Sequence, residues 1–474
     1  MQTKLHEATK LKSKTKKSNK LLSSILHTNG KTQNPQNRIV LLSTFFFILI
    51  GVYFFSIFHN DFEKFNAFLK ESTLGFTFIA IATTLFAYKV LFFIYTAYNY
   101  IKYKPVASVT DNKLPTCTVI VPAYNEGKQV WHTLMSLAKS NYPEHKLQLL
   151  AIDDGSLDDT WKWMLDAKEK LGNRLEILKQ PKNKGKRHAL YRGFNIGTGE
   201  IFITVDSDSI VTEDTLRNLV SPFVNNPQCG AVAGNIRVLN NKKEMLPKML
   251  DVSFVMSFEF VRSAESNLNS VLCTPGALAA YRSTAVAKCL PQWINQTFMG
   301  TPSDIGEDRA MTNMILKQGE HVLFQKNAVA YTNVPEEYLG LYKMFIRWGR
   351  SNVRENLEMA KYVFTNFRSG KKIGTRLLFI SHSARLIMSY PFLFFMLFFV
   401  LTHPLLFLGS TLVSILILST FSLAFFTNRY KSTQGFWAYP YSILYTFGLF
   451  WITPYAIATA SRSGWLTRGL PEKK

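Results

Sequence analysis

Two long apolar runs near the start of the chain constrain its fold more than any other feature of the sequence. Residues 39–58 are twenty apolar or small residues without a charge, and residues 74–98 form a second apolar run that contains one lysine. A run of this length can cross a bilayer as a helix. Residues 1–38 hold nine Lys and Arg and one acid, and basic segments beside a crossing stay in the cytoplasm. We therefore expect a disordered basic cytosolic tail over 1–38 and two transmembrane helices within 39–98.

Three further apolar runs follow near the end of the sequence, at 386–402, 405–427 and 438–460. They predict a C-terminal transmembrane region over 386–460 and a tail over 461–474. Three crossings after a cytosolic domain would leave the C-terminus outside, yet this tail is basic, which is typical of a cytoplasmic segment. Either a fourth crossing lies within 372–403 or one run re-enters the membrane, and the sequence leaves both open.

The overall charge is basic, with 55 Lys and Arg against 32 Asp and Glu. Such a balance suits nucleic acid, an anionic membrane face or a phosphorylated substrate. We expect no nucleic-acid partner, because the basic tail precedes an apolar run and no zinc knuckle or aromatic nucleic-acid motif accompanies it. The cysteines have neither metal-ligand spacing nor a disulfide pattern, which fits a reduced cytosolic compartment; they are Cys117, Cys229, Cys273 and Cys289.

Between the two groups of apolar runs, residues 110–335 are polar and alternate strand-like with helix-like segments. The strand-like segments read CTVIVPAYN, LQLLAIDDGS, LEILKQ, IFITVDSDS and CGAVAGNIRV. Helical stretches between several of them are typical of an α/β domain with a mainly parallel sheet. Residues 336–385 mix aromatic residues with Arg and Lys, and we interpret them as amphipathic helices at the membrane surface.

Two pairs of carboxylates stand at the ends of predicted strands. Asp153 and Asp154 end one strand, and Asp206 and Asp208 end another; ligands of open α/β sheets bind at such carboxyl ends. Asp206 and Asp208 point the same way because they lie two residues apart, and like charges held together need a positive partner. A shared Mg²⁺ or Mn²⁺, with substrate phosphate oxygens as its other ligands, would supply it. A solvated Asp-rich turn is the alternative.

A basic loop and an acidic helix start complete the set of polar clusters. The segment NKGKRHAL places Lys184, Lys186 and Arg187 around a glycine. Such a grouping can hold phosphate oxygens, and an exposed basic loop is the alternative. Glu307 and Asp308 head a helical pattern in IGEDRAMTNMIL.

In their order along the chain, these motifs resemble those of the family 2 glycosyltransferases. They are VIVPAYNEG at the first strand, DDGS at the next, Asp-x-Asp, Gly-Glu-Asp-Arg and then RW. The arrangement is similar to the processive membrane members, the hyaluronan, chitin and cellulose synthases. The resemblance covers residues 115–356, half of the chain. It implies an α/β domain of the GT-A type, which transfers sugars from nucleotides, inserted between transmembrane helices.

The resemblance also implies roles for single residues. The nucleotide-binding aspartate of the family falls on Asp153 or Asp154, and Asp206 and Asp208 would hold Mg²⁺ or Mn²⁺. Asp308 would be the catalytic base, with Glu307 and Arg309 beside it. The full set of implied nucleotide-sugar ligands is Pro122, Tyr124, Glu126, Asp153, Asp154, Lys186, Asp206 and Arg347.

On the acceptor side, the resemblance implies contacts from Trp348 and from Gly276 in TPGALAAYR. Met344 stands where the family's Gln-x-x-Arg-Trp motif has glutamine, which puts one acceptor or diphosphate contact in doubt. The segment GWLTRG resembles a Trp-Gly-Thr-Arg gating segment in which leucine replaces the glycine. Its implied gating residues are Trp465, Thr467 and Arg468.

These implications predict a processive, inverting β-glycosyltransferase that polymerises UDP-sugars and exports the product. The predicted product is hyaluronan, made from UDP-GlcNAc and UDP-GlcA. The alternatives are chitin or poly-N-acetylglucosamine from UDP-GlcNAc, a non-processive lipid glycosyltransferase, and a channel or scaffold that only binds nucleotides. The expected partners are UDP-sugars, the growing polysaccharide and the lipid bilayer, with a homo-oligomer or an auxiliary export protein left open. We expect a multi-pass protein of the plasma (inner) membrane with a cytosolic catalytic domain.

Overall fold

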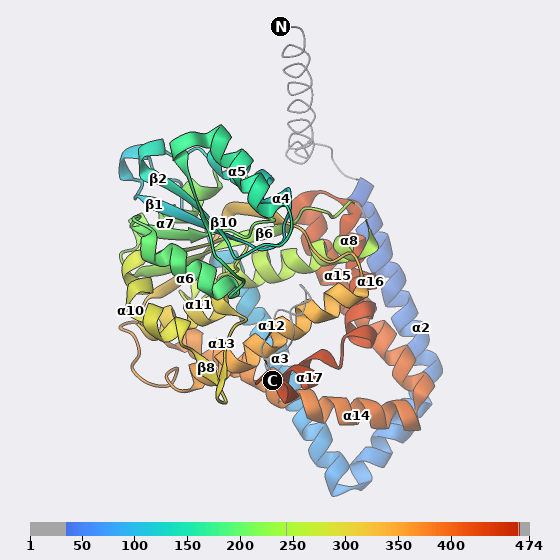
Figure 1. Ribbon diagram of the computed structural model, residues 1–474. Helices are drawn as coiled ribbons and strands as arrows, with labels where there is room; N and C mark the ends of the chain where they lie inside the picture. The colour runs from blue at the N-terminus through green and yellow to red at the C-terminus, as the bar shows by residue number, and fades with distance from the viewer. Residues whose placement is uncertain (1–34, 243, 463, 465–474) are drawn as a thin grey trace.

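The computed structural model describes residues 35–242, 244–462 and 464, and Figure 1 shows a compact α/β domain beside a group of long helices. An eight-stranded sheet forms the centre of the domain, in the order β3-β2-β1-β4-β7-β6-β10-β5. Its first half is parallel and consists of strands predicted from the sequence: β1 (Cys117–Ala123), β2 (Leu147–Asp153), β3 (Leu175–Lys179) and β4 (Ile201–Thr204). The chain builds β1, β2 and β3 in one direction and then crosses to β4 on the other side of β1. Ligands of open α/β sheets bind at such a reversal of strand order.

The second half of the sheet mixes strand directions. β6 (Cys229–Val238) and β10 (His321–Thr332) are parallel, whereas β7 (Ala279–Arg282) is antiparallel to β4 and β6, and β5 (Ile210–Val211) is antiparallel to β10. The sheet is therefore mainly parallel, as predicted. The sequence did not reveal β5 and β7, because such short strands have no readable period, nor β10, which an irregularity between Gln325 and Val329 interrupts.

Helices cover both faces of the sheet and separate two hydrophobic clusters. On one face lie α4 (Gln129–Ala138), α5 (Thr160–Leu171) and α7 (Thr215–Asn225), and on the other lie α6 (Lys186–Ile196), α10 (Ser283–Ile294) and α11 (Glu307–Lys317). Leu134 and Met164 are fully buried in the first cluster, and Ile315 is fully buried in the second. Burying a side chain of this size stabilises a fold by about 1.5–3 kcal/mol. A small hairpin, β8 (Thr297–Phe298) and β9 (Thr301–Pro302), precedes α11.

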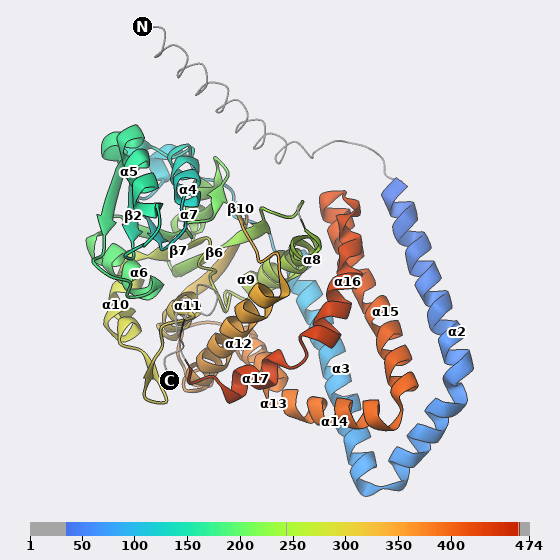
Figure 2. The ribbon, with the colours of Figure 1, turned by 45° about the vertical axis from the view of Figure 1, so that its right-hand side comes forward.

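Three helices of the described chain are long and apolar enough to cross a membrane. They are α2 (Pro35–Glu71), α3 (Thr73–Lys102) and α15 (Pro404–Tyr430). Ser72 starts α3, since its Oγ accepts a hydrogen bond from Gly75 N at 2.9 Å. Figure 2 shows the three helices running side by side, with α15 between the other two. α3 matches the predicted crossing at 74–98, whereas α2 contains the one predicted at 39–58 and continues to Glu71.

The remaining apolar segments differ from three simple C-terminal crossings. α13 (Ile373–Ile387) and α14 (Ser389–Thr402) meet at a 42° bend and together are also long and apolar enough for one span. The run 438–460, expected as one crossing, is instead split into α16 (Ala438–Ile443), a π-helical turn (Leu444–Gly448) and α17 (Ile452–Ala458). Pro440 and Pro454 lie inside this run, and proline interrupts helical hydrogen bonding.

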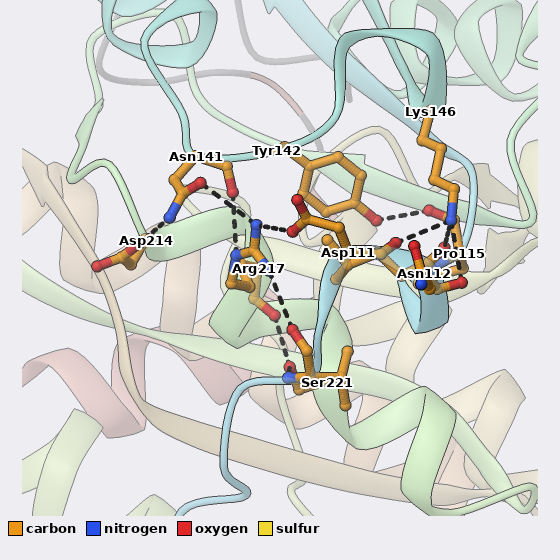
Figure 3. A network of polar contacts seen from close by, with 11 residues as sticks. Asp111, Asn112, Pro115, Asn141, Tyr142, Lys146, Asp214, Arg217 and Ser221 are labelled. Atoms are coloured by element: carbon orange, nitrogen blue, oxygen red, sulfur yellow. Dashed lines mark hydrogen bonds and ion pairs between the residues drawn. The ribbon is translucent and has the colours of Figure 1, made fainter.

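The linker between α3 and β1 is fixed to the domain by a polar network (Figure 3). Arg217 of α7 donates hydrogen bonds to Val109 O at 3.0 Å and to Asp111 Oδ1 at 2.5 Å. Lys146 donates to Asp111 O and Leu114 O, both at 2.9 Å. These bonds fix residues 109–114 of the linker to the domain.

A long interrupted helix of the domain contacts the end of α15. It consists of α8 (Met245–Phe254), a π-helical segment (Val255–Val261) and α9 (Arg262–Asn267). Glu259 on the π-helical segment is fully buried. Its carboxylate accepts from Arg429 Nε at 2.5 Å and Tyr430 OH at 2.6 Å, both at the end of α15, and it lies 3.1 Å from Lys326 Nζ of β10.

Candidate active site

A cavity of about 660 Å³ opens at the carboxyl ends of β1 and β4, where the strand order reverses. It continues between the π-helical segment, α11, α13 and α12 (Tyr338–Ala360). Most of the predicted site residues line it: Pro122, Tyr124, Asp154, Lys186, Asp206, Asp208, Gly276, Glu307, Asp308, Arg309, Arg347 and Trp348. The structure thus brings together residues that are more than 200 positions apart in the sequence.

Two of the predicted residues that the structure describes do not line the cavity. Asp153 is fully buried behind it and Glu126 lies on the neighbouring loop, where its backbone N–H donates to Thr160 Oγ1 at 2.8 Å. The gating residues lie outside the described residues; they are Trp465, Thr467 and Arg468.

Lys186 forms the electrostatic centre of the site. Its Nζ lies 2.5 Å from Asp206 Oδ1 and 3.1 Å from Glu307 Oε1, so it joins the end of β4 to the start of α11. Burial would lower the pKa of Lys186, but the attraction of Asp206 and Glu307 is stronger and raises it. For Glu307, burial opposes ionisation, and the charge of Lys186 outweighs it and lowers the pKa. Lys186 and Glu307 are therefore both ionised.

Asp308 has a different environment from Glu307, although the two are adjacent in the sequence. Burial and the repulsion of Glu307 raise the pKa of Asp308. Two backbone N–H groups hold its carboxylate, Arg309 N at 2.7 Å on Oδ1 and Gly276 N at 3.1 Å on Oδ2. A carboxylate with a raised pKa inside a cavity is suited to accept a proton.

The start of α11 requires a glycine. Gly306 caps the helix with a left-handed φ of +76°. A Cβ at this position would overlap Ser351 Oγ of α12. This close approach sets the first turn of α11, with Glu307 and Asp308, against α12 and the cavity.

The basic loop lies at the start of α6 and is held by Asp154. The Asp154 carboxylate accepts from Lys184 N at 3.0 Å, Gly185 N at 2.8 Å and Gln180 Nε2 at 2.8 Å. Burial raises the pKa of Asp154 to about 6, against the effect of the two backbone N–H groups. Asn183, Gly185 and Lys186 line the cavity, so the positive end of α6 faces it, and helix N-termini bind phosphate groups.

Asp153 keeps one carboxylate oxygen without a partner. Its Oδ1 accepts from Ser156 N at 3.0 Å and Ser156 Oγ at 2.5 Å, whereas the buried Oδ2 has no hydrogen-bond donor in the described structure. A buried acceptor without a hydrogen-bond donor is uncommon in folded proteins.

Asp206 and Asp208 provide donor atoms of the right chemistry for Mg²⁺ or Mn²⁺. Both line the cavity, and Asp208 Oδ1 accepts from Thr332 Oγ1 at 3.2 Å. In the described part of the chain, no group of three or more His, Cys, Asp or Glu side chains could hold a metal. Two carboxylates nevertheless fit a metal that takes its other ligands from phosphate and water.

α12 contributes an aromatic and apolar wall. Trp348 lines the cavity and packs edge-on against Phe345, with ring centroids 5.6 Å apart. Met344, at the position of the family's motif glutamine, also lines the cavity and is 6 % exposed. The wall near Met344 therefore offers a thioether where the family motif offers an amide.

Sequence reasoning missed the end of the cavity that lies toward the long helices. This end is lined by Arg262 and Glu265 of α9 and by His382 and Arg385 of α13. No motif marks these residues in the sequence. The two residues on each helix are three positions apart and therefore lie on the same face of that helix. This spacing is a sequence pattern from which they could have been predicted.

Comparison with known proteins places this geometry in a family. Residues 115–351 match the family model described as "Glycosyltransferase like family 2". The chain belongs to glycosyltransferase family 2. The motifs that line the cavity all lie within the matched segment, and the protein is a glycosyltransferase.

Several curated relatives are N-acetylglucosaminyltransferases of rhizobia. The protein of Rhizobium meliloti is 33% identical over 248 residues, which cover 52% of this chain and 58% of that protein. The protein of Mesorhizobium japonicum is 28% identical over 410 residues, which cover 85% of this chain and 93% of that protein. The chain thus spans about three fifths of the first relative and nearly all of the second.

Among solved structures, the fold is similar to that of the mannosyltransferase PcManGT from Pyrobaculum calidifontis. That structure is a complex with GDP-Man and Mn²⁺ and has 22% sequence identity and a TM-score of 0.53, covering 78% of this chain and 98% of that one. The likeness confirms the predicted type of sugar-transferase fold.

Proposed function

We propose that this family 2 glycosyltransferase is an inverting N-acetylglucosaminyltransferase that builds a β-linked N-acetylglucosamine chain from UDP-GlcNAc at the membrane. The observation that carries the proposal is the position of Asp308. Its carboxylate, with a raised pKa, lies in one cavity with the Lys186–Asp206–Glu307 cluster. A proton acceptor and a cluster for an anionic leaving group thus face the same space.

The transfer is a single displacement. The acceptor hydroxyl oxygen forms a bond to the anomeric carbon, the bond from that carbon to the diphosphate oxygen breaks, and UDP leaves with the electron pair. Asp308 takes the hydroxyl proton, which makes the oxygen a better nucleophile. Because attack and departure occur on opposite sides of the carbon, an α-linked donor gives a β-linked product.

The departing diphosphate needs positive charge, which this chain provides in three places. Lys186 lies beside Asp206, Arg347 lines the same cavity, and the N–H groups at the start of α6 face it. A divalent metal held by Asp206 and Asp208 would neutralise further charge on the diphosphate. We assign Trp348, which lines the cavity, to stacking against the acceptor sugar.

The donor assignment rests on the relatives. Those described above are N-acetylglucosaminyltransferases, which favours one UDP-GlcNAc donor over the two donors that hyaluronan requires. The three or four helices able to span a membrane support synthesis at the bilayer, with the product passed across it.

A donor assay tests the proposal. The full-length protein in lipid nanodiscs with Mn²⁺ is supplied with UDP-GlcNAc, UDP-GlcA, UDP-glucose or UDP-GlcNAc together with UDP-GlcA, and products are sized and digested with chitinase or hyaluronidase. We expect a chitinase-sensitive product from UDP-GlcNAc alone, with no increase on adding UDP-GlcA.

A hyaluronidase-sensitive product that requires both donors would replace the proposal with hyaluronan synthesis. UDP release from UDP-glucose alone would leave the family assignment intact and refute the GlcNAc donor. Asp208→Ala is the matched inactive control, and activity in that variant equal to the wild type would refute the metal-binding role of Asp208.

A further inference from the structure

Three guanidinium groups gather at the end of the cavity beyond Asp308. We propose that this end is an oxyanion-binding subsite, formed by Arg262, Arg309 and Arg385, that recognises a phosphate or carboxylate on the acceptor that receives the first sugar. The inference rests on the proposed transferase function and adds the chemical class of the acceptor. It arises from residues that no motif of the sequence singled out, apart from Arg309.

Arg309 is the most confined of the three. Its side chain is 6 % exposed, it lines the cavity, and its buried Nε has no hydrogen-bond partner in the described structure. Its Nη1 makes one long contact of 3.5 Å to Leu272 O. A buried guanidinium with an unused donor costs free energy unless a ligand accepts that hydrogen bond.

Arg262 of α9 is in a similar environment to Arg309 of α11. Its guanidinium lies over the Phe258 ring, 4.1 Å from the centroid, and its buried Nη1 has no acceptor among the described residues. Burial lowers the pKa of Arg262, with Cys273 and Glu265 acting in the other direction. Stacking on Phe258 fixes the plane of the guanidinium, so its free edge can bind an oxyanion bidentately.

The carboxylates nearby do not neutralise these arginines. Within the described residues, no ion pair joins Arg262, Arg309 or Arg385 to a carboxylate. Glu265 lines the same end of the cavity, but burial raises its pKa to about 7, so it is only partly ionised near neutral pH. The carboxylate of Asp308 already accepts from two backbone N–H groups. A net positive charge therefore faces the cavity.

The subsite lies where membrane-type helices reach the catalytic domain. Glu265, His382 and Arg385 also line a second, smaller cavity of about 140 Å³ together with Tyr95, Thr96 and Asn99 of α3. Both α3 and the α13–α14 pair are long and apolar enough to span a membrane. An acceptor whose anionic group sits here would extend from Asp308 toward the bilayer, as a sugar phosphate linked to a lipid or a uronate-containing chain would.

Matched acceptors test the proposal with the full-length protein in phosphatidylcholine nanodiscs and UDP-GlcNAc as donor. GlcNAc 1-phosphate is compared with methyl β-GlcNAc, and a GlcNAc–glucuronic acid disaccharide is compared with N,N′-diacetylchitobiose. We expect kcat/KM to be about tenfold higher for at least one anionic acceptor than for its neutral match, since charge-assisted hydrogen bonds are the stronger ones. The pair that shows the preference identifies phosphate or carboxylate as the recognised group.

Substitutions test whether the subsite causes the preference for anionic acceptors. Arg262→Gln should reduce the anionic-to-neutral ratio to near one, and Arg262→Lys should retain part of it. Arg192→Gln is the control, because Arg192 lies on α6 and donates to Lys179 O on an exposed surface; it should leave the ratio unchanged.

Equal kcat/KM for anionic and neutral acceptors in the wild type, or an unchanged ratio in Arg262→Gln, would overturn the proposal. Absence of transfer to all four acceptors would instead contradict the proposed function, and with it the subsite that rests on it.

Discussion

At the scale of single residues, Gly276 shows how closely the site is assembled. Its backbone N–H donates to Asp308, and a Cβ at this position would lie 2.5 Å from Lys186 Nζ. The absence of a side chain therefore lets Lys186 and the Asp308 carboxylate approach the same short segment. The resemblance gave Gly276 an acceptor contact, whereas the structure places it between Lys186 and Asp308.

Gly276→Ala should displace Lys186 from its contacts with Asp206 and Glu307. We expect KM for UDP-GlcNAc to rise about tenfold, because a charged contact to the diphosphate is worth roughly 1.5 kcal/mol or more. Initial-rate kinetics on the purified protein measure this change. Gly51→Ala is the control, since its added Cβ would meet Val413 Cγ1 at an ordinary 3.5 Å. A KM for Gly276→Ala equal to that of the wild type would contradict the crowding argument.

At the scale of elements, the π-helical segment joins the catalytic cavity to the end of α15. Phe258 and Arg262 line the cavity, while Glu259 between them binds Arg429, Tyr430 and Lys326 on the other side. A π-helical turn shifts the register of the side chains that follow it. This shift allows adjacent residues of one helix to serve the site and the membrane-type helix at once.

Glu259→Gln should destabilise the protein, because it removes the buried carboxylate that Arg429 and Lys326 share. Losing a hydrogen bond to a charged group costs about 1.5–3 kcal/mol, and thermal unfolding in detergent should show a lower midpoint. Glu358→Gln, which removes a partly exposed pair with Lys361, should change the midpoint little. Equal midpoints for Glu259→Gln and the wild type would contradict this role.

The pH dependence of the same interaction has a defined sign. Burial would raise the pKa of Glu259, but Arg429, Tyr430 and Lys326 together lower it below the usual 4.5. A depressed carboxylate pKa gives stability that is present above pH 4.5 and lost as the pH falls through the folded-state value. The stability difference between wild type and Glu259→Gln should therefore shrink in acid.

At the scale of the whole molecule, sequence reasoning identified the elements with strong local patterns. The charge-free run at 39–58 and the strands that end in Asp153 and Asp206 were readable because their periods and flanking polar residues agree. The short strands β5 and β7 were not readable, since pairing with β10 and with β4 and β6 creates them. The split of 438–460 depends on prolines inside an apolar run, which hydropathy alone does not weigh.

The residues of the candidate site also form two groups, those that the sequence predicted and those that only the structure revealed. Asp206, Glu307 and Asp308 belong to motifs and were found in the sequence, and the structure adds that Lys186 joins them. Arg262 and Arg385 lie in segments without a motif, and only the folded positions of α9 and α13 bring them to the cavity. Contacts between distant helices carry no local signature, so this half of the site required the structure.

The most direct test of the account compares Asp308→Asn with the wild type in two measurements on the same preparation. Asparagine keeps the shape of the side chain and cannot accept the hydroxyl proton as a carboxylate does. We predict that UDP-GlcNAc binding, measured by calorimetry, stays within about threefold, while transfer falls by about 1,000-fold, within the range lost with a general base. Transfer by Asp308→Asn at a rate close to that of the wild type would contradict the account.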